Sequence, residues 1–190
     1  MPLARIGKGI ELNQRGERDA ARAVFAQVWS DIGGESGDPF HRCALAHSMA
    51  DVQDDVHDEL VWDLRALEAA DLMTDERAAQ AGVTSPVAGL YPSLHLNLGE
   101  CPRKLGNLDV AHEHLGRGQA AVSSLGDDGY GQMIKEASAA ARPFARAVPP
   151  RPRHARHIAA CRPPWGSHNS AQIDAARSRD RHASGLSAAP

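Results

Sequence analysis

One spacing of small and large residues occurs twice in this chain, in segments far apart in the sequence. The segments "RGERDAARAVF" and "LGNLDVAHEHL" align without a gap, and each follows a further glycine at the same distance. The two sets are Gly9, Gly16, Ala21 and Phe25, and Gly99, Gly106, Ala111 and Leu115. A small residue where two helices cross lets their backbones approach, and a large apolar residue one turn later fills the groove. The spacing therefore predicts two helical hairpins of one design, each turning at its second glycine.

A weaker copy lies between these two segments. "CALAHSMADVQDD" predicts its first helix and "ELVWDLRALEAADLM" its second, with Asp54 or Asp55 capping the second helix. Leu60 and Leu64 stand where the alanine and the large residue are expected, one residue out of register. The third copy begins late, which predicts an inserted loop or a lengthened helix end at residues 74–90.

Apolar residues recur at spacings of three and four through most of the first 142 residues, which is typical of helices. The predicted helical stretches are residues 12–32, 40–73, 91–125 and roughly 130–141, and glycine, proline and aspartate mark the breaks. No segment alternates apolar and polar residues for long enough to predict a strand. We expect an all-α fold.

Charge divides the chain into two parts. Residues 1–142 have a net charge of −9, whereas residues 143–190 have +6 and are rich in Pro, Arg, Ala and Ser. Such a tail buries too little apolar surface to offset its ordering entropy, so we expect a helical domain at 1–142 and a disordered tail at 143–190. Three widely spaced cysteines, no apolar run long enough for a membrane span and no apolar signal segment predict a cytoplasmic protein without a membrane partner.

The hairpin pattern resembles the tetratricopeptide repeat, in which a Leu-Gly pair is followed by A-x3-F over about 34 residues. The resemblance covers roughly residues 3–125 and implies an α-solenoid of about three such hairpins plus a terminal helix. Pro102 replaces the first-helix aromatic of the family, and we expect it to kink or shorten that helix. A non-repeat helical bundle is the alternative fold.

The resemblance implies a protein-interaction module, a scaffold or adaptor that binds a peptide or helix on the concave surface of its first helices. The residues expected there are Asn13, Gln14, His41, Ser48, Asp51, Leu96, Glu100, Arg103 and Lys104. Ile6 and Ile10 replace the Lys and Asn with which family members hold a C-terminal carboxylate, so we do not expect that ligand. We also expect the N-terminal hairpin, with Leu3 and Ile6 on its outer face, to be able to form a homodimer.

We expect no catalytic site, cofactor or metal ion. Nucleophile and phosphate-binding motifs are absent, and Cys43 and Cys101 are expected to be packing residues. His112 and His114 point about 200° apart on a helix, so they cannot share a metal. The alternative function is a part of a bacterial transcription regulator whose basic tail contacts nucleic acid. A solvated tail without function is the simpler interpretation, so we expect no nucleic-acid partner for the folded part.

Overall fold

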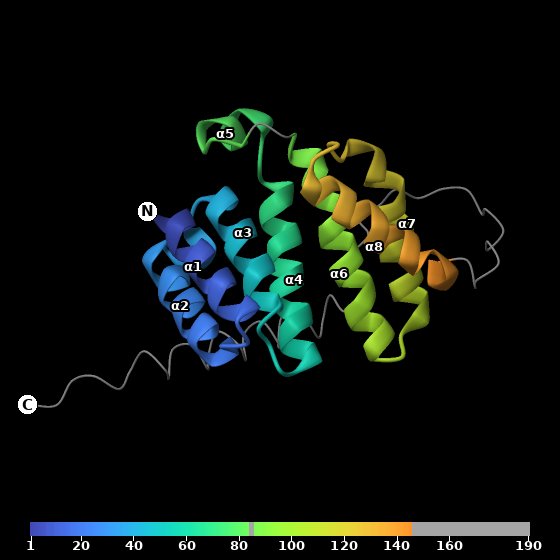
Figure 1. The fold of residues 1–190 in the computed structure, drawn as a ribbon, viewed down its shortest axis with the longest axis horizontal. Helices are drawn as coiled ribbons and strands as arrows, with labels where there is room; N and C mark the ends of the chain where they lie inside the picture. The colour runs from blue at the N-terminus through green and yellow to red at the C-terminus, as the bar shows by residue number, and fades with distance from the viewer. Residues whose placement is uncertain (84–85, 146–190) are drawn as a thin grey trace, which may run out of the picture. The chain divides into compact units, whose positions relative to one another are not determined.

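The computed structural model describes residues 1–83 and 86–145, which form helices and connecting turns without a strand (Figure 1). The all-α prediction is therefore confirmed for this part of the chain. The α-helices are α1 (Pro2–Gln14), α2 (Arg18–Asp31), α3 (Pro39–Ala50), α4 (Val56–Asp71), α5 (Asp75–Gln80), α6 (Tyr91–Lys104), α7 (Leu108–Ala121) and α8 (Gly129–Ala145). Short 3-10 turns are η1 (Gly34–Ser36), η2 (Val87–Leu90) and η3 (Val122–Ser124).

Three antiparallel pairs, α1–α2, α3–α4 and α6–α7, make the most extensive contacts in the domain. The first and third pairs correspond at an offset of 90 positions, except that α6 begins one residue earlier than α1. Helices α2 and α7 each have 14 residues, and their starts differ by that offset. The preceding turns also match, because Gly16 and Gly106 adopt φ angles of +81° and +77°. Glycine reaches this left-handed conformation without the steric cost of a Cβ atom.

The turn after α1 is a Schellman motif, in which two backbone N–H groups satisfy the last free carbonyls of the helix. The Gly16 N–H donates to the Asn13 carbonyl at 2.9 Å, and the Glu17 N–H donates to the Leu12 carbonyl at 2.9 Å. Gly16 thus ends the first helix of this hairpin at the turn that the sequence pattern predicted.

The turn after α6 repeats this motif and explains why Pro102 is tolerated. The Asn107 N–H donates to the Pro102 carbonyl at 2.8 Å, so the proline contributes its acceptor to the cap. Helix α6 continues through Pro102 and ends at Lys104, the position equivalent to the end of α1. The expected shortening of this helix is wrong, because the helix continues for two residues past Pro102 and ends in the same cap as α1.

The helix crossings depend on Gly9 and Gly99. A Cβ atom at Gly9 would lie 2.7 Å from Cδ1 and Cζ of Phe25, and one at Gly99 would lie 2.7 Å from Cγ of Leu115. Ala21 and Ala111, one turn before these large residues, are also buried. The predicted packing of small against large residues is therefore confirmed in both hairpins.

The middle hairpin departs from this arrangement. Its connecting loop has five residues, 51–55, where the other two hairpins have three, and Asp55 caps α4 by accepting from the His57 N–H at 2.7 Å. Leu60 and Leu64 are only half-buried. The buried residues at this crossing are instead alanines on both helices together with one cysteine, namely Cys43, Ala46, Ala66, Ala69 and Ala70. The longer loop changes the register of α4, so the expected pair does not fill the groove.

An apolar core joins the first two hairpins, and Ile6 belongs to it with only 4% of its surface exposed. The expectation that Ile6 lies on the outer face of the N-terminal hairpin is therefore wrong, whereas Leu3 and Ile10 on the same helix are exposed. Beside this core, the rings of Trp29 and Trp62 pack edge to face at 5.0 Å between centroids.

A charged cluster lies beside the two tryptophans. Arg42 and Arg65 are both buried and share the carboxylate of Glu35, at 3.1 and 2.8 Å respectively. The Arg65 guanidinium also lies 4.3 Å from the centroid of the Trp62 ring, a cation–π distance. These contacts connect η1, α3 and α4.

The third hairpin packs on the second mainly through α6 against α4 (Figure 1). The inserted segment that the sequence predicted contains the short helix α5 and the turn η2. Helix α8 packs on α7 and α6 and runs to Ala145, three residues past the predicted boundary at 142. The rest of the predicted tail, residues 146–190, lies outside the described residues.

Candidate functional site

The residues predicted for partner recognition lie on or at the end of the first helices of the three hairpins, α1, α3 and α6. Gln14, Asp51, Arg103 and Lys104 are exposed, whereas Asn13, His41, Leu96 and Glu100 are half-buried. Ser48 is buried, and its hydroxyl donates to the Ala44 carbonyl of its own helix at 2.9 Å. Ser48 therefore has its hydrogen bond satisfied within the helix, and the other eight residues have accessible surface.

Ion pairs organise the charges at the end of α6. The Arg103 guanidinium donates to both oxygens of Glu100 at 2.7 Å, a bidentate geometry. The hydrogen bonds from Arg103 hold the pKa of Glu100 below its usual value. The Lys104 ammonium donates to both oxygens of Glu59, on α4, at 2.9 Å. This end of the predicted surface is therefore a set of paired charges, not a positive patch.

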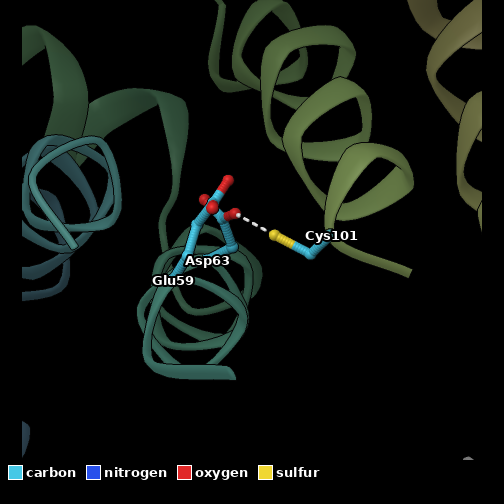
Figure 2. Close-up of side chains that lie close together, drawn as sticks. All are labelled: Glu59, Asp63 and Cys101. Carbon is cyan, nitrogen blue, oxygen red and sulfur yellow. Dashed lines mark hydrogen bonds between the residues drawn. The ribbon is translucent and has the colours of Figure 1, made fainter. Parts of the chain in front are cut away.

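A second group of polar side chains lies between α4 and α6 and includes Glu59, the partner of Lys104. The group consists of Glu59, Asp63 and Cys101 (Figure 2). Each has one atom that could bind a metal ion, a carboxylate oxygen or the thiol sulfur, and these three atoms all lie within 4.8 Å of one another. The Cys101 thiol donates to Asp63 Oδ2 at 3.6 Å, and the Asn97 amide donates to Asp63 Oδ1 at 3.4 Å. Asp63 and Cys101 are buried, with 1% and 0% exposure.

Burial determines the protonation of this group. It raises the pKa of Asp63 to about 7, against the smaller lowering by hydrogen bonds from Asn97 and Cys101. Burial also raises the pKa of the Cys101 thiol well above its usual value, and the neighbouring Asp63 carboxylate adds to this shift. The thiol is therefore protonated at neutral pH and is a poor nucleophile.

Among the described residues, Glu59, Asp63 and Cys101 form the one group of three or more such side chains that could hold a metal ion, through two carboxylates and a thiolate. Two features favour a hydrogen-bonded polar contact instead: Lys104 already neutralises Glu59, and Cys101 retains its proton. Asp63 was not among the residues predicted from the sequence, although a signal for it was present. Glu59 and Asp63 are four residues apart on a predicted helix, which places both on one face.

A histidine pair joins α6 and α7. Nδ1 of His95 lies 3.1 Å from Nδ1 of His114, and the ring centroids are 5.3 Å apart. Burial lowers the pKa of each imidazole to about 4, so both are neutral at pH 7. The sequence indicated only that His114 could not share a ligand with His112. Its actual neighbour lies 19 residues earlier, on the other helix of the hairpin.

A small hollow lies where α6, α7 and α8 meet. It is lined by Pro92, Leu96, Leu115, Gly118, Gln119, Ser138 and Ala141. Leu96, one of the predicted recognition residues, therefore contributes to a depression whose far wall comes from α8. The lining is mostly apolar, and the hollow has room for little more than a water molecule, so it is a shallow depression and not a ligand pocket.

Comparisons with known proteins give no further assignment, because no family model, curated protein or solved structure matches this chain. Among the described residues, no helix is long and apolar enough to cross a membrane.

Proposed function

We propose that residues 1–142 form a protein-recognition domain of the tetratricopeptide type, a scaffold or adaptor without catalytic activity. The observation that supports this proposal best is the correspondence between the first and third hairpins. They share the Gly-Ala-large apolar crossing, the Schellman turn and the length of the second helix at an offset of 90 residues. Tandem hairpins of one design form an extended surface that binds peptides or helices.

The binding surface in this proposal is formed by the first helices α1, α3 and α6. Their exposed side chains include amide and acidic groups and the paired charges around Arg103. Leu96 adds an apolar position at the hollow beside α8. A surface with this mixture of groups suits an amphipathic segment with charges of both signs, in a cytoplasmic setting.

Site-specific photocrosslinking tests this proposal. A photoreactive amino acid is placed at exposed first-helix positions, Gln14 and Arg103, in the full chain. The control positions are Asp19 on α2 and Asp109 on α7. Both are exposed, and they occupy equivalent positions of the two second helices, 90 residues apart. If the first helices bind the partner, one protein should crosslink at Gln14 and at Arg103, and neither control should capture it.

Two outcomes would contradict this proposal. Crosslinks at Asp19 and Asp109 alone would move the binding surface to the second helices. Loss of all crosslinks on deletion of residues 146–190, with the helical domain still folded, would favour binding by the basic tail. The alternative function, a regulator that contacts nucleic acid through this tail, predicts instead that the chain binds nucleic acid and that deletion of residues 146–190 abolishes this binding.

A further inference from the structure

A pair of imidazoles on neighbouring helices is the feature that the recognition function leaves unexplained. His95 of α6 and His114 of α7 face each other with their Nδ1 atoms 3.1 Å apart. A single hydrogen bond between the rings satisfies one nitrogen of each, and its direction depends on the tautomers. Neutral imidazole nitrogen is the commonest protein ligand of zinc and similar ions.

We propose that His95 and His114 form a two-histidine site for a divalent transition-metal ion, which clips α6 to α7. The separation of the two nitrogens fits this role. Zinc–nitrogen bonds are about 2.0–2.1 Å long, so two nitrogens 3.1 Å apart enclose an angle of about 95–100° at the ion. That angle lies between the values for octahedral and tetrahedral coordination, and water completes the remaining positions.

The backbone keeps the two rings together. Gly118, one turn after His114, allows a close approach of α7 to α6, because a Cβ atom there would lie 3.3 Å from Cβ of His95. The Tyr91 ring packs on His95 at 6.2 Å between centroids, and its hydroxyl donates to Asp71 at 2.8 Å. The backbone and Tyr91 therefore hold the two nitrogens at a separation that they can keep when both bind one ion, although each ring must turn so that its lone pair points to the ion.

The proton balance of binding is simple. A neutral imidazole has one ring proton and one free nitrogen lone pair, and in this hydrogen-bonded pair one of the two rings holds its proton on Nδ1. The ring that holds its proton on Nδ1 passes it through water to its own Nε2. Both rings then bind through Nδ1 as the Nε2-protonated tautomer, and no net proton is released.

The surrounding charges are mixed. Asp71 and Glu113 act on His95 as negative charges, whereas Arg117 acts on both imidazoles as a positive charge. Arg117 donates to Glu113 at 2.5 Å, which offsets much of its repulsion of a cation. A two-histidine site in this setting should be weaker than a structural zinc site with four protein ligands.

Thermal unfolding of the full chain with increasing Zn²⁺ at pH 7 tests this proposal. An ion that binds the folded state raises the melting temperature, and a rise of about 5–10 °C is expected at about 100 times the dissociation constant. Zn²⁺ also binds side chains that become accessible only in the unfolded chain, Cys43 and Cys101 among them, which reduces the rise, so the wild-type response is compared with that of variants lacking one imidazole. EDTA should reverse the rise.

The variants His95→Gln and His114→Gln should each lose this rise. His112→Gln is the matched control on the same helix and should keep it. No rise in the wild-type chain, or an equal rise in the His95→Gln chain, would overturn the proposal.

A second measurement needs no variant. In nitrogen NMR of the wild-type imidazoles, one equivalent of Zn²⁺ should shift the Nδ1 signals of His95 and His114 first. If the signals of other histidines shift at lower Zn²⁺ than these two, the proposed site is wrong.

Discussion

The change Gly9→Ala should destabilise the domain, although alanine is normally the better helix residue. Gly9 lies inside α1, where replacing glycine by alanine gains about 1 kcal/mol in helix propensity. The added Cβ atom would collide with the ring of Phe25, whose side chain is completely buried. Overpacking of this kind costs about 1–3 kcal/mol.

Gly7→Ala is the matched control, because Gly7 lies in the same helix and a Cβ atom there meets nothing within 4 Å. The gain in propensity is common to both variants, so the difference between them isolates the overpacking cost. We therefore expect Gly9→Ala to be about 1–3 kcal/mol less stable than Gly7→Ala. At about 4 °C for each kcal/mol in a domain of this size, the melting temperatures should differ by about 4–12 °C.

The third hairpin provides an internal repeat of this experiment. Gly99→Ala should also be less stable than its control Gly116→Ala, where a Cβ atom has open space. The difference should be smaller, because Leu115 is a flexible side chain with 8% exposure, whereas the Phe25 ring is rigid. Melting curves by circular dichroism measure all four variants. Equal melting temperatures for Gly9→Ala and Gly7→Ala would refute the crossing contact as the reason for this glycine.

Three further predictions follow from buried charges and from the end of α8. Since the pKa of Asp63 is raised to about 7, the folded chain keeps a proton that the unfolded chain releases near pH 4. Asp63 by itself should therefore lower the free energy of unfolding by about 1 kcal/mol per pH unit from pH 4 to 7, opposite in sign to the contribution of His95 and His114. In urea titrations, the stability of Asp63→Asn relative to the wild-type chain should accordingly rise by about that amount per pH unit, and a constant difference would contradict this. Glu35→Gln should cost about 2–3 kcal/mol in the same assay, because Arg42 and Arg65 lose their shared carboxylate; an unchanged midpoint would contradict this. A chain ending at Ala145, the last residue of α8, should keep its helical spectrum and melt within about 2 °C of the full chain, since the described helices pack on one another; a larger loss would show that the remaining residues contribute to stability.

The sequence determined most of what is local in this fold. Helix ends follow from residues within one turn: Gly16 and Gly106 for the left-handed caps, Asp55 for the start of α4. The crossings of the first and third hairpins were also predictable, because a three-residue turn fixes the register of two helices. Gly9 and Phe25 are thereby brought together without help from the rest of the molecule.

Tertiary packing decided the rest. The five-residue loop before α4 left the register of the middle hairpin open, so Leu60 and Leu64 were wrongly expected at its crossing. Ile6 is buried because α3 packs against α1 and α2, a contact for which the sequence of α1 gives no signal.

The contacts of Asp63 with Cys101 and of His95 with His114 could not be predicted from the sequence, because they also depend on how the helices pack. Asp63 meets Cys101 across 38 residues, and His95 meets His114 across 19. Whether such side chains meet depends on how each helix is rotated about its own axis, and a rotation of about 100° moves a contact by one residue. That rotation is set by the sum of all apolar contacts in the packed domain, so the sequence alone predicted the helices, and only the folded chain decided which polar groups they bring together.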